Sequence, residues 1–271
     1  MEVSHPDLGG DRFAVAARRR AFADEIPVPG LSRDATVVAN RPAGGQVRNP
    51  RLLRALRAAV LARGGAVEEG APVARPCVRK CGAVGVFRET GELVEAGALL
   101  LCGGTWTAGV AEVTGRPLPV RPVRGQMALL DCGARPFRPV VECGARYLVP
   151  RDDGRVLAGA TQEEAGFDAR VTAAGVAGLL DFARTLVPTL AGARVERTWA
   201  GLRPATPDGN PLLGPVPGVD RLFVAAGHFR DGLQQSPGTA AILADLIEGK
   251  ASPIPLNELT VDRFDALGGP R

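Results

Sequence analysis

LFVAAGHFRDGLQQSPGTAAILADLI, residues 222–247, decides the fold of this 271-residue chain. Its first five residues, Leu222–Ala226, form an apolar run between charged residues and a glycine, which predicts a buried strand. Its last part has apolar residues at helical spacing, with Ser236 as the expected N-cap, Pro237 at the first helical position and Gly249 after the last turn. The stretch therefore predicts a strand followed by a helix, the unit of α/β proteins.

The connection between this strand and helix is a polar loop, GHFRDG, with a glycine at each end. Gly227 and Gly232 let the backbone approach a bound group closely. The helix start behind them offers backbone N–H groups and a positive dipole end to electron-rich atoms. We therefore expect a ligand-binding turn. The alternative is an ordinary strand-to-helix connection of an α/β domain.

A second glycine turn follows another apolar run. Residues 99–102, LLLC, predict a fully buried strand of a parallel sheet, and Gly103 and Gly104 come directly after it. Open α/β sheets bind their ligands at the carboxyl ends of strands. This turn is therefore a second candidate for ligand binding.

The remaining patterns divide the chain into an α/β part and an antiparallel part. In the α/β part a helix begins at Asn49 and Pro50 and ends at two glycines. The other elements expected there are a strand at 66–68 and a hairpin of 84–88 with 93–96. A helix is also expected within 12–24, ahead of the α/β part. From residue 117 we expect antiparallel strands at 120–130, 146–149, 156–160 and 194–203, with one helix at 176–187 closed by Pro188.

Composition excludes several classes of protein. The net charge of +4 comes from scattered arginines without interleaved aromatic residues, so no nucleic-acid site is expected. No apolar run is long enough to span a membrane. Five cysteines, an odd and dispersed number, predict reduced thiols in the cytoplasm. Cys77 and Cys81 lack further histidine or cysteine partners, so no metal site is expected.

Seven segments make the chain resemble a known family. The sequence is similar to the flavin-dependent amino-acid oxidases of the D-amino-acid oxidase and glycine oxidase (ThiO) type. The matching segments, in the order of the family, are GGQVRNPRLLRAL (44–56), LLLCGGTW (99–106), LPVRPVRGQM (118–127), RYLVPR (146–151), GRVLAGAT (154–161), TWAGLRPATPDGNPLLG (198–214) and AGHFRDGLQQSP (226–237).

The resemblance implies a fold class and a division into domains. The class is α/β, α+β overall, with an incomplete Rossmann-like FAD-binding domain and an antiparallel β-sheet domain for the substrate. The FAD-binding domain is expected at 44–116 and 206–265, and the substrate domain at 1–43 and 117–205.

The implied activity is oxidation of the amine of a small amino acid, such as glycine, sarcosine or a D-amino acid, to an imino acid. FAD is the implied cofactor, and its flavin takes a hydride from the substrate α-carbon. The alternatives are a D-amino-acid dehydrogenase that passes electrons to a quinone, and a truncated remnant without activity. A homo-oligomer is compatible with the resemblance, and its size stays open.

The resemblance also implies roles for three side chains. Arg203, in AGLRP, matches the arginine that holds the substrate carboxylate, which suits a guanidinium that forks onto both oxygens. Tyr147, in RYLVP, matches a tyrosine on the substrate side of the flavin, and Arg230 matches a residue at the pocket entrance. The structural alternatives are a salt bridge at a strand end for Arg203 and a half-buried strand tyrosine for Tyr147.

The expected cofactor contacts come mainly from the loop after residue 226. In the family the backbone of this loop packs on the isoalloxazine ring, and no side chain acts as a base, so a catalytic histidine is not expected. Val73 matches a position whose backbone meets the adenine. The full expected set is Val73, Gly103, Gly104, Gly227, His228, Phe229, Arg230, Asp231, Gly232, Leu233 and Gln234.

The sequence departs from the family in two ways. It contains no G-x-G-x-x-G turn, which binds the cofactor pyrophosphate in this family. We therefore expect a chain truncated at its N-terminus, with weak FAD binding, marginal stability and no activity alone; a cofactor half from another chain is the alternative. Gln162 replaces an apolar residue common in glycine oxidases and Asp231 replaces a frequent asparagine, so the substrate stays open.

Overall fold

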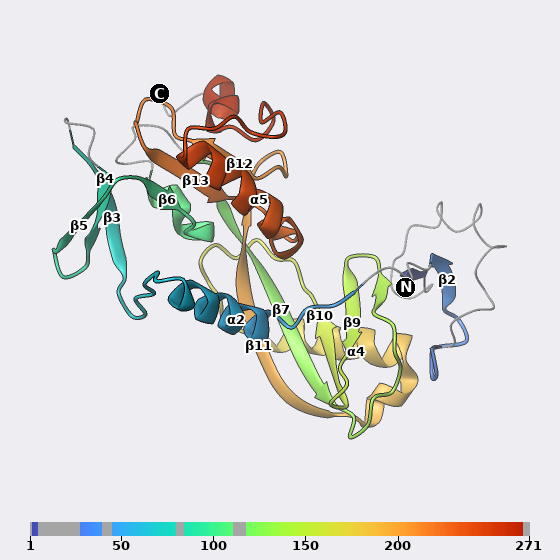
Figure 1. The fold of residues 1–271 in the computed structure, drawn as a ribbon. Helices are drawn as coiled ribbons and strands as arrows, with labels where there is room; N and C mark the ends of the chain where they lie inside the picture. Colours follow the sequence, from blue (N-terminus) through green and yellow to red (C-terminus); the bar gives the residue numbers. More distant parts are fainter. Residues whose placement is uncertain (1, 5–27, 40–44, 80–83, 111–117, 268–271) are drawn as a thin grey trace. The chain divides into compact units, whose positions relative to one another are not determined.

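The structure is a computed structural model, and it describes residues 2–4, 28–39, 45–79, 84–110 and 118–267 (Figure 1). The helix expected within 12–24 lies outside these residues. The chain forms two compact units, each made of two segments: 1–58 with 124–201, and 59–123 with 202–271. The assignment of cofactor binding and substrate binding to separate domains stays a prediction.

The first unit is built on a seven-stranded sheet with the order β11-β7-β10-β9-β8-β1-β2. Neighbours from β7 through β10 to β9 and β8 pair antiparallel, as expected, whereas β1 runs parallel to β8. The ends of β7 and β11 extend into the second unit. The strands are β1 (Glu2–Ser4), β2 (Thr36–Ala39), β7 (Arg121–Asp131), β8 (Val141–Cys143), β9 (Arg146–Pro150), β10 (Arg155–Gly159) and β11 (Arg194–Ala205).

One helix packs on this sheet, α4 (Ala173–Leu186). Its buried residues include Leu179, Phe182 and Leu186, which share one face and join the core formed by the inward residues of β7, β9 and β10. Thr172 caps the helix by accepting a hydrogen bond from Gly175 N at 3.1 Å. A 3-10 helix, η3 (Pro188–Gly192), follows directly, so the expected helix closed by a proline is confirmed.

The second unit contains a three-stranded sheet with β13 in the middle. Its strands are β12 (Leu212–Pro215), β13 (Leu222–Ala226) and β6 (Leu99–Leu101). Every residue of β13 is buried, which confirms the predicted strand. Leu222 and Val224 face one core cluster, whereas Phe223 and Ala225 face another that includes Leu243 of α5 (Gly232–Ile247). Alternation along β13 therefore buries both faces of the sheet.

A second sheet of this unit has the order β3-β4-β5. The hairpin of β4 (Val84–Arg88) and β5 (Leu93–Ala96) was predicted and is confirmed. The strand predicted at 66–68 is wrong, because these residues are exposed and irregular. The strand β3 (Val73–Val78) pairs with β4 instead. Its sequence, VARPCV, contains Arg75 and Pro76, so it lacks the apolar pattern that predicts a strand.

The helix α2 (Asn49–Ala62, labelled in Figure 1) has the expected start, but its apolar face is exposed. It has no buried residue, and Leu53, Leu56 and Val60 are 65%, 52% and 43% exposed. Within the part of the chain that the structure describes, nothing covers this face. Such a face is typical of a surface that another element packs against.

The structure corrects two predictions, one about β6 and one about the start of α5. β6 is half-buried and ends at Leu101, so Cys102 is exposed after the strand and not inside it. The helix α5 starts at Gly232, four residues before the predicted N-cap at Ser236. Pro237 therefore lies inside the helix and cannot donate to the carbonyl four residues earlier, but the Ser236 hydroxyl donates to that same carbonyl, Leu233 O, at 2.9 Å.

We expect Ser236→Ala to lower the free energy of unfolding by about 0.5–1 kcal/mol, because the Leu233 carbonyl then loses the hydrogen bond from the Ser236 hydroxyl. Thermal unfolding followed by circular dichroism measures the change. In a Pro237→Ala background the backbone N–H returns, so the cost of Ser236→Ala should fall to near zero. An equal cost in both backgrounds would contradict this account of the helix start.

Candidate functional site

The candidate site lies where β6 and β13 end. These strands pair parallel, with Leu99 opposite Leu222 and Leu101 opposite Val224. Because neighbouring parallel strands end at the same edge of a sheet, the structure brings together the turn after β6 and the loop after β13. The first turn leads into the 3-10 helix η2 (Gly104–Val110) and the second leads into α5.

Gly227 begins the loop in a left-handed conformation, with φ of +79°. A β-carbon there would lie 2.5 Å from Cγ2 of Thr206, a buried residue of the β11–β12 connection. The glycine was predicted as a place for close approach of a ligand. In the structure, Thr206 occupies the space that a side chain at position 227 would need. The sequence alone did not single out this threonine.

The middle of the loop is held to the end of β11, just before this connection. Phe229 has a positive φ of 48°, and its backbone N donates to Pro204 O at 2.9 Å. Pro204 directly follows Arg203, which lies half-buried on β11. The structure therefore brings the backbone beside the expected carboxylate-binding arginine to the loop.

His228 is braced inside the loop. Its Nε2 lies 3.0 Å from Oγ1 of Thr239 on α5. Burial lowers the pKa of His228 below its ordinary value of 6.5, so the ring is neutral at pH 7. A β-carbon on Gly232 would approach the His228 Cβ to 3.2 Å, so this glycine leaves room for the histidine.

The start of α5 retains its positive end. Its N-cap residue, Asp231, makes no side-chain cap hydrogen bond, and no acidic residue lies in the first turn. The neighbouring residues Arg230, Leu233 and Gln234 are exposed. At the other turn, a β-carbon on Gly104 would meet nothing within 4 Å. This edge of the sheet therefore offers open space beside a helix dipole that attracts electron-rich atoms.

Two predicted residues lie elsewhere. Val73 is the exposed first residue of β3, a strand that contacts η2. Tyr147 belongs to the first unit, on β9, where its hydroxyl lies 3.6 Å from Met127 Sδ. A β-carbon on Gly159, directly opposite in β10, would lie 2.9 Å from Tyr147 Cε2, so this glycine accommodates the tyrosine ring.

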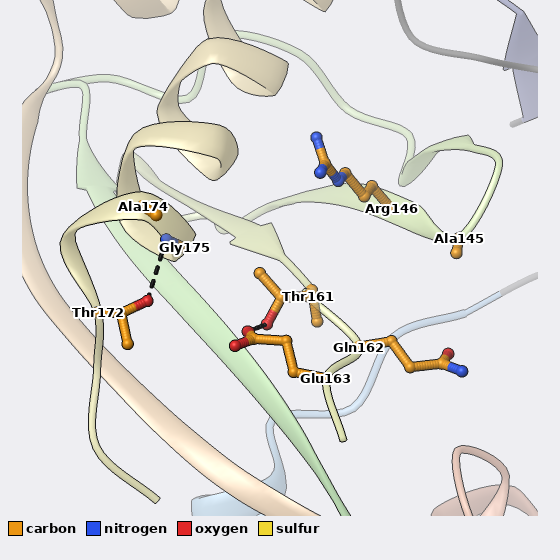
Figure 2. Close-up of a pocket in the computed structure, with 9 residues that line it drawn as sticks. Ala145, Arg146, Thr161, Gln162, Glu163, Thr172, Ala174 and Gly175 are labelled. Atoms are coloured by element: carbon orange, nitrogen blue, oxygen red, sulfur yellow. Dashed lines mark hydrogen bonds between the residues drawn. The ribbon is translucent and has the colours of Figure 1, made fainter. Parts of the chain in front are cut away.

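The first unit also has a cavity of about 380 Å³ near the start of α4 (Figure 2). Arg146, Gln162 and Glu163 contribute to its lining, and Arg146 donates to Gly178 O of α4 at 3.2 Å. Side chains alternate along a strand, so Arg146 faces α4 whereas Tyr147 faces the opposite side of the sheet. This cavity is therefore separate from the face that carries Tyr147.

The polar groups around the cavity bind one another. Glu163 accepts from Arg124 Nη2 at 2.6 Å and from Gln126 Nε2 at 2.8 Å. It also accepts from the neighbouring Thr161 hydroxyl (Figure 2). Arg124 is only 7% exposed and Gln126 is fully buried. Gln126 also donates to Thr172 Oγ1 at 3.0 Å, which connects the network to the start of α4. The network therefore supports the sheet and helix of this unit.

We expect this network to make the first unit sensitive to acid. Burial alone would raise the pKa of Glu163, but hydrogen bonds from Thr161, Arg124 and Gln126 outweigh it and lower the pKa below its ordinary value of 4.5. A lowered folded-state pKa contributes stability that is present above the unfolded pKa and is lost as pH falls through the folded value. Between pH 6 and pH 3.5, Glu163→Gln should therefore lose less thermal stability than the unchanged chain.

The matched control for this measurement is Glu258→Gln, a change at an exposed position of the other unit. It should leave the pH dependence of the melting temperature unchanged. Identical pH profiles for Glu163→Gln and the unchanged chain would contradict the stabilising role of the carboxylate.

The described residues contain neither a metal site nor a membrane span. No group of three or more histidine, cysteine, aspartate or glutamate side chains there is placed to hold a metal ion. Cys81 of the cysteine pair considered above lies outside those residues. Likewise, no helix in the described part is long and apolar enough to cross a membrane.

An α/β unit with two glycine turns at one sheet edge, in a chain that also forms a unit with an antiparallel sheet, agrees with the fold that the resemblance to flavin-dependent oxidases implies. Comparison with known proteins agrees. The family model described as DAO, FAD dependent oxidoreductase, matches residues 20–246. The chain belongs to this family.

Similar proteins include glycine oxidases. The chain is 41% identical to the glycine oxidase of Pseudomonas putida over 210 residues, which are 77% of this chain and 57% of that protein. The crystal structure of glycine oxidase from Geobacillus kaustophilus matches with a TM-score of 0.78 and 34% identity, over 82% of this chain and 60% of that one. The structure of iminodiacetate oxidase from Chelativorans sp. BNC1 matches with a TM-score of 0.77 and 31% identity, over 85% of this chain and 63% of that one. The chain thus spans about 60% of the relatives that it matches.

Proposed function

We propose that this chain is part of an FAD-dependent enzyme that oxidises the amine of a small amino acid to an imino acid by hydride transfer to flavin. The proposal rests on the two glycine turns that β6 and β13 bring to one sheet edge, in a chain of the DAO family. Glycine, sarcosine and D-amino acids are the substrates proposed. Similar proteins named glycine oxidase and iminodiacetate oxidase support substrates of this size.

The residues at this edge fit the ring of a flavin. The positive end of α5 suits the electron-accepting pyrimidine end of the ring, and the open space at Gly104 leaves room for a neighbouring part of the cofactor. When bound, FAD supplies the hydride acceptor. In this proposal the backbone of Gly227 to Gln234 packs on the ring, and Val73 meets the adenine.

The side chains then bind and orient the substrate. Arg203 holds the carboxylate with its fork of donors, and Tyr147 donates its hydroxyl on the same side of the flavin. Arg230 lines the pocket entrance. His228 has no catalytic role in this proposal, because the flavin and not a side chain takes the hydride. The loop therefore contributes mainly its backbone, with Arg230 at the entrance, whereas β9 and β11 contribute Tyr147 and Arg203.

Arg203→Ala tests the carboxylate role in the flavin-loaded enzyme. Two charge-assisted hydrogen bonds of about 1.5–3 kcal/mol each are lost, so KM should rise at least about a hundredfold. Arg203→Lys should restore only part of the affinity, because an ammonium group has no fork. Arg197→Ala, at an exposed position of the same strand, is the matched control. Steady-state kinetics with an unchanged KM for Arg203→Ala would place the carboxylate elsewhere.

FAD binding by the 271-residue chain tests the cofactor side. The sequence has no G-x-G-x-x-G turn, and the apolar face of α2 is exposed, so we expect weak binding by this chain alone. Fusion of a strand–G-x-G-x-x-G–helix segment from a family member should give stoichiometric binding and flavin absorbance. The same segment with its glycines changed to valine is the control. Tight binding by the unfused chain, measured by fluorescence titration, would contradict the expectation.

A further inference from the structure

A nearly buried arginine of the second unit is not explained by the proposed chemistry. Arg263 lies on the 3-10 helix η4 (Val261–Leu267), and its side chain is only 10% exposed. Its Nε and Nη2 donate to the two carboxylate oxygens of Asp208, at 2.8 and 3.2 Å. This two-point geometry fixes both the distance and the orientation of the pair.

The same guanidinium binds the backbone around Asp208. Nη2 also donates to Asn210 O at 2.8 Å, and Nη1 donates to Thr260 O at 2.8 Å. Asp208 in turn accepts from Asn210 N at 3.1 Å. Arg263 therefore joins η4 to residues 206–211, the connection between β11 and β12. This connection has no regular hydrogen-bond ladder of its own, so its shape depends on such contacts.

The connection carries these contacts to the candidate flavin loop. The Thr206 hydroxyl donates to Asn210 O at 2.7 Å, the same carbonyl that Arg263 binds. This bond orients the Thr206 side chain. Its methyl group faces Gly227, because a β-carbon on that glycine would lie only 2.5 Å from the methyl carbon. Just before the connection, Pro204 O accepts from Phe229 N at 2.9 Å. The loop thus contacts the chain at two points, the end of β11 and the start of the connection.

We propose that the Arg263–Asp208 pair is a positioning device for the loop at 227–231, because it holds the connection whose first residue, Thr206, packs against Gly227 and directly follows the end of β11 to which Phe229 binds. Arg263 and Asp208 are then positioning residues, acting on the loop through Asn210 and Thr206. The proposal extends the proposed function, which gives the loop its task, but the arrangement of the loop is measurable without flavin.

The test uses the full chain without FAD and two readouts confined to the loop. Amide hydrogen exchange reports on the Phe229 N–H, and NMR titration reports on the His228 ring, which is simple to assign because His5 is the only other histidine. In Arg263→Lys and Asp208→Asn, the Phe229 amide should exchange at least about tenfold faster, as expected for the loss of a charge-assisted bond. The pKa of His228 should rise toward its ordinary value as its burial decreases.

A milder variant and a matched control complete the design. Thr206→Val keeps the methyl group but removes the hydroxyl that donates to Asn210 O. It should therefore change both readouts in the same direction by a smaller amount. The control is Arg170→Lys, which alters a two-point bond to Asp168 in the other unit, where Arg170 is 87% exposed. It should leave the loop unchanged.

Three outcomes overturn the proposal. The first is an unchanged Phe229 exchange rate and His228 pKa in both ion-pair variants. The second is an equal increase in exchange throughout the second unit, β6 and β13 included, which would make the pair a support of the whole unit. The third applies if the ion-pair variants do not fold. In that case, an unchanged Phe229 exchange rate and His228 pKa in Thr206→Val contradict the proposal. If the loop changes as expected but the fused protein still binds no FAD, the proposed function fails and the positioning role stands.

Discussion

Parallel pairing between β6 and β13 is the constraint on which the candidate site depends. It places two glycine turns, from positions far apart in the sequence, at one edge of a sheet. Parallel neighbours cannot be joined by a short hairpin, so the chain must leave after β6 and return before β13. In this protein the route between them contains α4 and most strands of the antiparallel sheet. The long excursion that carries Tyr147 is therefore also the crossover that makes the parallel pair possible.

Local sequence patterns predicted the elements whose structure depends only on residues within the element itself. β13 was predicted because five consecutive apolar residues suit a strand buried on both faces, and α4 because its apolar residues share one face. The start of α5 was missed because it depends on a side-chain bond, from Ser236 to Leu233 O, that replaces the bond which Pro237 cannot make. β3 was missed for a related reason: its pairing to β4 outweighs the unfavourable Pro76 in its sequence.

The same distinction applies to the site. Sequence reasoning found both glycine turns and assigned the need for glycine at position 227 to a ligand. The structure adds a second reason, because a β-carbon there would lie 2.5 Å from Thr206 Cγ2. The contacts of Thr206, Asp208 and Arg263 left no signal, because Arg263 lies far along the chain in a short helix without a motif. The segment TWAGLRPATPDGNPLLG was recognised as a family match, yet only three-dimensional contacts show its second half as the support of the loop.

The alternation along β9 has a consequence for how this protein can change during evolution. Arg146 and Tyr147 are neighbours in the chain, but one serves the helix-covered side of the sheet and the other the opposite side. Substitution at either position alters one side alone. Loss or gain of a single residue in the strand would instead exchange the two sides, taking the arginine from Gly178 and placing the aromatic ring against α4. Side chains on either face of this sheet can therefore change by substitution without disturbing the other face, whereas the length of the strand is fixed.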